Sequence, residues 1–283
     1  MRKLLLLLLV TATTAFAQSD ETSRSWNQPV EPFKIIGNVF YVGASDIASY
    51  LIATPKGHIV LDGGFVETAP MIRANIEALG FKYEDVKIIL NSHAHYDHAG
   101  GLAELKSTTS AKLYASTGDA PLLEAGGKGD PQFGDKYPFP PVKPDDTIHD
   151  LDRVALGGSI LTARITPGHT KGCTTWTMTV RERGKSYNVA FLCSPSVPDS
   201  YRLVGNPAYT NAVADYRKHF NILKAMSVDV FLAAHGAFFN LTEKRGRLAE
   251  GDKDAFIDPQ GYKDFVAEME ARFEEKVREQ SKE

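Results

Sequence analysis

The chain has 283 residues, of which 43% are hydrophobic and 24% charged, and its formal net charge is −3 at pH 7. This composition is typical of a soluble globular protein with a sizeable core, and the acidic balance gives no basic surface for nucleic acid. The length suits one large domain or two small ones. Two cysteines are too few for a disulfide scaffold or a cysteine-rich zinc site.

The first 17 residues have the pattern of a secretory signal peptide. Arg2 and Lys3 precede a leucine run, and Ala15-Phe16-Ala17 provides small residues where a signal peptidase reads them. Cleavage after Ala17 would leave one mature domain, residues 18–283, without a membrane anchor, because the apolar run is too short to span a bilayer. A retained anchor is the alternative. We expect export to an oxidising compartment, the bacterial periplasm.

Periodicity predicts alternating elements in the first half of the chain. Strands are expected at 34–44 and 48–54, with a turn between them, and at 58–64 and 86–91. Helices are expected at 67–80 and 99–106. The strand at 86–91 is a continuous apolar run, which is typical of an interior strand. Residues 126–146 are rich in glycine, proline and aromatic residues, so no regular element is expected there, and a loop of this length is usually functional or disordered.

The second half repeats the alternation. Short strands are expected at 146–150, 153–158 and 160–166, a hairpin at 174–180 and 187–193, a helix at 211–226 and a strand at 228–234. A last helix begins at Gln260 and carries an apolar stripe that is expected to pack in the core, made of Tyr262, Phe265, Val266, Met269, Phe273 and Val277. This alternation predicts a layered α/β sandwich in one domain.

The stretch "NSHAHYDHAG" places His93, His95, Asp97 and His98 directly after the interior strand. In extended chain, residues two apart point the same way, so His93 and His95 can reach one point. Asp97 and His98 come where the chain turns into a helix and can reach a second point nearby. Imidazole and carboxylate are preferred zinc ligands, so the stretch offers half-sites for two metal ions.

Two further histidines could complete these half-sites. His169 lies in the glycine-flanked loop "TPGHTKG", and His235 ends the apolar strand in "LAAHGAFF". The remaining histidines, His58, His149 and His219, occupy plain strand or helix contexts and are interpreted as surface or core residues.

These motifs resemble the metallo-β-lactamase superfamily. His93-x-His95-x-Asp97-His98 is similar to its metal-binding motif, and "VLDGG" (Asp62), "TPGHTKG" and "AAHG" match its other motifs in order, over roughly residues 34–240. The resemblance implies a four-layer αβ/βα sandwich with a two-zinc site at one edge of the two sheets.

The segment "AFLCSPSVP" indicates which branch the chain resembles. Lactonases and thiolesterases of this superfamily carry a bridging aspartate there, whereas this chain has Ser194, with Cys193 one position before. A serine there is similar to class B, subclass 3 β-lactamases. The resemblance then implies two ligand sets, His93, His95 and His169 for the first zinc, and Asp97, His98 and His235 for the second. Cys193 becomes a candidate ligand if the register is off by one.

The resemblance also implies roles around the metals. Ser194 and Ser196 would contact the substrate carboxylate, with plain strand-end serines as the alternative. Asp97 would orient a zinc-bound hydroxide that attacks the β-lactam carbonyl of carbapenems, cephalosporins or penicillins. Asp62 would orient a ligand or the metal loop, or else cap an ordinary turn. Loop 126–146 and the segment around Ser49 and Tyr50 are expected to wall the pocket.

The hairpin turn near residues 183–184 places Cys173 across from position 193 or 194, so a cross-strand disulfide with Cys193 is geometrically reasonable in an exported protein.

A zinc-dependent lactonase or thiolesterase of the same fold is the first alternative function, and a non-catalytic zinc-binding module is the second. The expected partner is a small-molecule β-lactam, and the expected state is a monomer.

Overall fold

The structure, a computed structural model, describes residues 21 and 23–282. The predicted signal peptide, residues 1–17, lies outside this part of the chain. Within it, no helix is long and apolar enough to cross a membrane.

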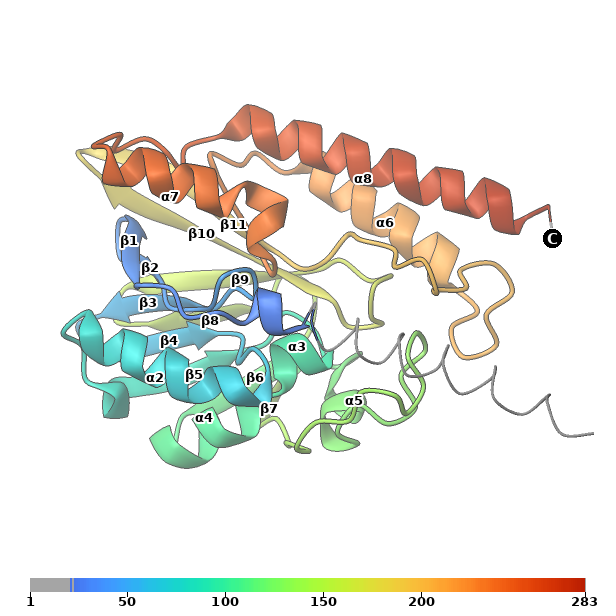
Figure 1. Ribbon diagram of the computed structural model, residues 1–283, viewed down its shortest axis with the longest axis horizontal. Helices are drawn as coiled ribbons and strands as arrows, with labels where there is room; N and C mark the ends of the chain where they lie inside the picture. Colours follow the sequence, from blue (N-terminus) through green and yellow to red (C-terminus); the bar gives the residue numbers. More distant parts are fainter. Residues whose placement is uncertain (1–20, 22, 283) are drawn as a thin grey trace, which may run out of the picture.

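Two sheets face each other at the centre of the molecule (Figure 1). The first has seven strands in the order β1 (Phe33–Ile36), β2 (Val39–Tyr41), β3 (Tyr50–Thr54), β4 (Gly57–Leu61), β5 (Val86–Leu90), β6 (Lys112–Ser116) and β7 (Asp146–Ile148). The second has five strands in the order β12 (Val230–Ala233), β11 (Lys185–Leu192), β10 (Thr174–Glu182), β9 (Ser159–Ile165) and β8 (Arg153–Leu156).

Helices cover the outer faces of both sheets, so the predicted four-layer arrangement is confirmed (Figure 1). Beside the first sheet lie α2 (Ala69–Ala78), α3 (Tyr96–Ala99), α4 (Leu102–Thr109) and α5 (Ala120–Glu124). Beside the second lie α6 (Ala212–Ala225), α7 (Leu241–Ala249) and α8 (Pro259–Gln280). Helix α8 begins with a proline and is capped by Asp258, whose carboxylate accepts the Gly261 amide.

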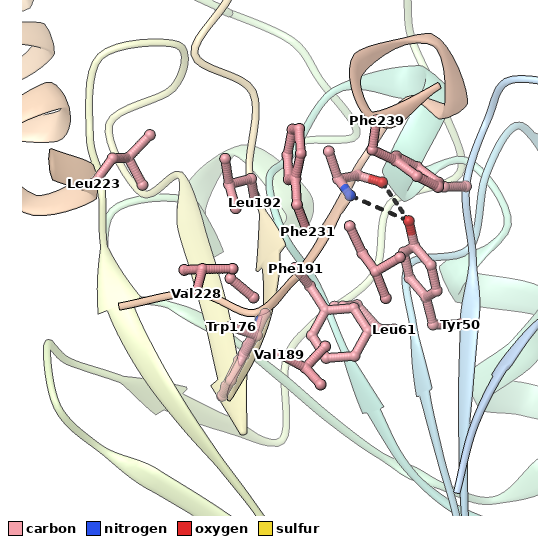
Figure 2. Packing of buried hydrophobic residues seen from close by; sticks show 14 of the residues in the cluster. Tyr50, Leu61, Trp176, Val189, Phe191, Leu192, Leu223, Val228, Phe231 and Phe239 are labelled. Carbon is pink, nitrogen blue, oxygen red and sulfur yellow. Dashed lines mark hydrogen bonds between the residues drawn. The ribbon is translucent and has the colours of Figure 1, made fainter. Parts of the chain in front are cut away.

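The inner faces of the sheets pack through large side chains (Figure 2). Trp176 and Phe191 from the second sheet are fully buried against Leu61 and Tyr50 from the first. The Tyr50 hydroxyl donates to the Ala233 carbonyl at 2.6 Å and accepts the Ala233 amide at 3.2 Å, which ties β3 to β12. Within the segment around Ser49 and Tyr50, which was expected to wall the pocket, Tyr50 itself therefore faces the core, where its polar end is satisfied.

The apolar stripe of the last helix packs as predicted. Tyr262, Val266, Met269, Phe273 and Val277 are buried in the same core as the second sheet, and Phe265 is partly buried against it. A second core lies between the first sheet and its helices and includes Leu51, Val60, Ile89 and Leu113.

The prediction missed strand β6 and helices α5 and α7, and the expected strand 34–44 is divided into the antiparallel pair β1 and β2. Strand β6 reads "KLYAS", so only three apolar residues lie between a lysine and a serine, yet it pairs in parallel with β5 and β7. Helix α5 has only five residues, too short for helical periodicity to appear. Loop 126–146 contains no helix or regular strand until β7 begins at Asp146, as expected.

The topology brings several strand ends to one edge. Strands β4, β5 and β6 run parallel, so the residues after each of them meet at the same edge of the first sheet. Strand β12 runs parallel to β11, and both lead toward this edge, as the contact of Ala48 with Ala234 across the sheets indicates. The segments after these strands carry the candidate ligands.

Candidate metal centre

Three buried histidines form the first donor group. His93 and His95 follow β5, and His169 comes from the loop between β9 and β10. Their ligand atoms all lie within 4.8 Å of one another. The ring centroids of His95 and His169 are 4.6 Å apart, although 74 positions of sequence separate the two residues. The structure therefore brings together the residues that the motifs predicted for one metal.

Asp97, His98 and His235 form the second donor group. The distances between their donor atoms are 3.3 Å (His98 Nε2 to His235 Nε2), 3.4 Å (Asp97 Oδ2 to His98 Nε2) and 3.5 Å (Asp97 Oδ2 to His235 Nε2). Ligands about 2.0–2.1 Å from a tetrahedral zinc lie roughly 3.3–3.4 Å apart. This triangle thus has the size of one face of a tetrahedral metal site. His93, Asp97 and His98 also lie within 4.8 Å of one another, so the two groups adjoin.

The electrostatics of the centre fit a bound cation. Burial, and then the neighbouring histidines, hold the pKa of His93 and of His169 well below the usual range, which keeps these imidazoles neutral as metal ligands must be. Burial tends to raise the pKa of Asp97, but His98 and His235 outweigh it and keep the carboxylate ionised. His93, His169 and Asp97 are thus in the protonation states that metal ligands require. Burial lowers the pKa of His235, but Asp46 and Asp97 outweigh it and raise the pKa to about 9, so a metal at this ring would take the place of a proton.

Three of the rings have a hydrogen-bond partner outside the donor groups, and the fourth, His95, has a carboxylate close by. The Ser92 hydroxyl lies 2.9 Å from His93 Nδ1, and the Ser196 carbonyl oxygen lies 2.9 Å from His169 Nδ1. The other two partners are carboxylates. Asp130 Oδ2 lies 3.2 Å from His95 Nε2, and Asp46 Oδ2 lies 2.8 Å from His235 Nδ1. Such partners set the orientation and basicity of ligating histidines.

Sequence reasoning missed both carboxylates. Asp130 lies in the loop 126–146, and its Oδ1 also accepts the amides of Gln132 and Phe133, which shapes the loop beside the centre. Asp46 lies in a turn before β3, and its Oδ1 accepts the Ala237 amide. The "GDPQFGD" stretch gave a weak signal for Asp130, whereas the signal for Asp46 was its closeness to the segment around Ser49 and Tyr50, which was expected at the pocket.

Asp62 lies beneath the metal-ligand stretch, at the end of β4. Its Oδ1 accepts the Ser92 amide at 2.6 Å and the Asn91 side-chain amide at 3.1 Å, so it holds the backbone just before His93. Burial raises its pKa to about 6, although His98 and these hydrogen bonds counteract the rise. Asp62 adopts φ 65°, an uncommon backbone conformation for this residue type.

Ser194 and Ser196 lie just beyond β11, beside His169. Their hydroxyls are 2.8 Å apart, and the Ser196 carbonyl oxygen also accepts the Tyr216 hydroxyl. Ser194 is buried, and Ser196 is partly exposed. Cys193 is bonded to Cys173, which confirms the predicted disulfide and removes its thiolate as a metal ligand.

The loop 126–146 lies against residues 93–98, which carry four of the six donors, as expected. The Phe133 ring lies 4.9 Å from the His95 ring, and Tyr137 stacks on Tyr96 at 4.4 Å. Tyr96 and Tyr137 also line a cavity with Phe65. Trp26, from the N-terminal arm, meets the His235 ring edge-on at 5.3 Å. Ser49 is buried, with no hydrogen-bond partner for its hydroxyl among the described residues.

The other three histidines lie away from both donor groups, as predicted. His149 is exposed, with 71% of its side chain accessible. His58 packs edge-on against Phe81. His219 is fully buried between the rings of Tyr216 and Phe220.

Solved structures similar to this chain cover nearly all of it. One is the native FEZ-1 metallo-β-lactamase from Legionella gormanii, with 40% identity, a TM-score of 0.89, and coverage of 90% of this chain and 98% of that one. Another is BJP-1, a subclass B3 metallo-β-lactamase of Bradyrhizobium japonicum, with 41% identity, a TM-score of 0.85, and coverage of 90% and 97%.

Curated relatives match a shorter region. A hydroxyacylglutathione hydrolase of Rhodospirillum rubrum is 35% identical over 37% of this chain and 32% of its own length. The N-acyl homoserine lactonase AttM of Agrobacterium fabrum is 32% identical over 44% of this chain and 56% of its own length. The chain therefore spans about half or less of the length of these relatives.

The family model described as the metallo-β-lactamase superfamily matches residues 42–180, which include residues 93–98 and His169. Together with the chain-wide likeness to solved enzymes at about 40% identity, this match shows that the chain belongs to the metallo-β-lactamase superfamily of metal-dependent hydrolases.

Proposed function

We propose that the chain is a β-lactamase that uses two zinc ions to open the β-lactam ring of carbapenems, cephalosporins and penicillins. The observation that carries the proposal is the pair of adjoining donor groups at one sheet edge, with Ser194 rather than a carboxylate at the end of β11. The similar solved structures that cover 90% of the chain are metallo-β-lactamases, which supports the same substrate class.

The two donor groups are assigned to two metals. His93, His95 and His169 would hold the first zinc, and Asp97, His98 and His235 would hold the second. Zinc suits these ligands, because imidazole and carboxylate at tetrahedral spacing are its usual partners, and a catalytic zinc keeps one position open. When bound, it supplies Lewis-acid chemistry and lowers the pKa of a bound water to about 7.

The protein's own groups bind and orient. Asp97 is both a ligand and, through its ionised carboxylate, an acceptor that can orient the attacking water and take up its proton. Ser194 and Ser196 lie beside His169 with their hydroxyls paired, and a substrate carboxylate could accept hydrogen bonds from both. Asp62 positions the backbone before His93.

The first experiment follows the ring absorbance of a carbapenem with purified protein, with and without a chelator. Turnover that the chelator abolishes and zinc restores is the expected result. A fully metallated protein without turnover on carbapenem, cephalosporin and penicillin would contradict the proposal.

Hydrolysis of a lactone or a thiolester is the second candidate function. The names of the curated relatives favour it over their matched regions. The absence of an aspartate at position 194 counts against it. An acyl-homoserine lactone and a glutathione thiolester, assayed beside the β-lactams, distinguish the two, because the higher kcat/KM identifies the substrate class.

We also propose that the protein is exported to the periplasm after cleavage following Ala17, and acts as one monomeric domain of residues 18–283. The N-terminal sequence and mass of the protein recovered from the periplasmic fraction test the export and the cleavage site. A first residue other than Gln18 would contradict the cleavage site.

A further inference from the structure

Asp119 is a buried carboxylate that belongs to neither donor group. It occupies the N-cap position of α5, in the turn after β6, and is 2% exposed. Aspartate at this position ordinarily caps its own helix, but the Asp119 side chain makes no such hydrogen bond. The described residues also place no cationic lysine or arginine against it. Its burial therefore needs another explanation.

The Asp119 carboxylate bonds to two segments that are far apart in the sequence. Its Oδ2 accepts the Ala94 amide at 3.0 Å and the Thr170 hydroxyl at 2.7 Å, and its Oδ1 accepts the Gly172 amide at 2.7 Å. Ala94 lies between His93 and His95, and Thr170 follows His169. One carboxylate thus links both segments that carry the first donor group.

The turn that carries Asp119 lies in close contact with the loop after His169. A Cβ on Gly172 would lie 1.9 Å from the Ser116 hydroxyl oxygen and 2.4 Å from the Asp119 amide nitrogen. A Cβ on Gly118 would lie 2.7 Å from the Lys171 carbonyl oxygen. The turn that carries Asp119 therefore packs backbone to backbone against the loop after His169, and glycine is required on both sides.

The energetic balance favours a positioning role. Removing a carboxylate from water is costly unless charge-assisted hydrogen bonds replace the lost hydration, and here three donors do so. Burial raises the pKa of Asp119, and the hydrogen bonds from Thr170, Gly172 and Ala94 counteract this. All three donors come from the ligand-bearing segments, so these segments are held where the carboxylate is.

We propose that Asp119 is a positioning residue that fixes the spacing between His93 and His95 on one segment and His169 on the other, and so preorganises the first metal site. It acts through the Ala94 amide and the Thr170 hydroxyl, and touches neither metal nor substrate. The second group, which includes His235, has no bond to Asp119 and should be unaffected. The inference rests on the proposed assignment of donors to metals, but not on the substrate.

The test measures zinc affinity in two backgrounds. In His235→Ala only the first group is intact, and in His169→Ala only the second. Asp119→Asn is added to each, and Zn²⁺ affinity is measured by competition with a chromophoric chelator. We expect a loss of about 10- to 100-fold in the His235→Ala background, the usual cost of losing an outer partner, and less than about twofold in the His169→Ala background.

Controls separate positioning from general destabilisation. Asp145→Asn removes a carboxylate that accepts the Leu113 amide in β6, the strand that leads to Asp119. Asp145 touches neither the His93–His95 segment nor the His169 loop, so this variant should leave both zinc affinities unchanged. If Asp119→Asn does not fold, Thr170→Val removes one of the three hydrogen bonds and Thr170→Ser retains it. Only the valine variant should weaken the first site.

The absorption spectrum of the Co²⁺-substituted protein gives a second readout. Its bands report coordination geometry, so they should change on Asp119→Asn in the His235→Ala background and remain unchanged in the other. Equal effects in both backgrounds, or no effect in His235→Ala, would overturn the proposal. None of these measurements uses a substrate, so a failed β-lactam assay would leave the result standing.

Discussion

The two donor groups are held in different ways. The first consists of three buried imidazoles, whose segments are joined through Asp119 and whose ring partners include Ser92 and a backbone carbonyl. The second is more open, with 14% of the His235 side chain exposed, and its donors already form a triangle of 3.3–3.5 Å. It depends on Asp46 and on the packing of Trp26. The comparison indicates that hydrogen bonds between two segments position the first group, whereas ion pairs of His235 with Asp46 and Asp97 position the second.

Removing one ligand from either group is expected to give the largest effect. His169→Ala should eliminate the first site and Asp97→Ala the second, with the fold intact, because these side chains point into the site rather than the core. Each variant should lose activity well beyond the roughly 100-fold that loss of an outer partner costs. Metal analysis after dialysis should find about one equivalent less than in the unmodified protein. Wild-type turnover in either variant would refute the assignment.

The disulfide lies next to the loop that carries His169. Cys173 directly precedes β10, and its bond to Cys193 closes a separation of 20 residues. Cys173→Ala with Cys193→Ala should lower the free energy of unfolding by about 3 kcal/mol in the chain-entropy model. Denaturant unfolding measures the loss, and the same variant tests whether the second group keeps its metal. Two free thiols in the unfolded, unreduced protein would show that the bond does not form.

Replacing the carboxylates beside the ligands by amides should weaken one metal site at a time. Asp46→Asn should weaken the second site, and Asp130→Asn the first, each by about 10- to 100-fold in zinc affinity. Each variant is the other's control, since the two carboxylates contact different ligands, His235 and His95. Competition titrations in the His169→Ala and His235→Ala backgrounds measure the effects. A loss of equal size at both sites would show that the groups are not supported independently.

His219 gives the smallest expected effect, on the pH dependence of stability. Burial lowers its pKa to about 3, although the backbone of Thr166 and Pro167, at the start of the His169 loop, counteracts part of this. Below about pH 6.5 the unfolded chain binds a proton on this residue and the folded chain does not, so the free energy of unfolding decreases as the pH is lowered. Between pH 7 and pH 5 the free energy of unfolding should fall by about 2 kcal/mol less in His219→Leu than in the unmodified protein.

Denaturant unfolding at the two pH values measures this difference. Protonation of the metal ligands affects both proteins equally and cancels in the comparison. An unchanged pH dependence in the variant would mean that His219 is protonated in the folded state.

The sequence predicted much of this site because its donors are concentrated. Four of the six lie within residues 93–98, and an interior strand, recognisable as an apolar run, precedes them. The cysteine pairing was also accessible, since the "RERGKS" turn fixes the register, with Glu182 paired to Lys185. Local patterns of this kind determine local geometry directly.

The outer partners could not be predicted in this way. Asp46, Asp119 and Asp130 look like ordinary turn aspartates in the sequence, and turns favour aspartate for local reasons. The orientation of Tyr50 toward the core could not be predicted either, because a tyrosine in a strand gives no indication of whether its hydroxyl meets water or a carbonyl across the core.

The sequence by itself determined the layered α/β class, the donor types and the disulfide, because each follows from periodicity or from close spacing along the chain. Only the tertiary structure decided which carboxylate supports which ring. That choice depends on parallel strands ending at one edge, where Asp46 meets His235 across 189 positions and Asp119 meets Thr170 across 51. Contacts between such distant segments depend on sheet order and on backbone approach, neither of which a local pattern records.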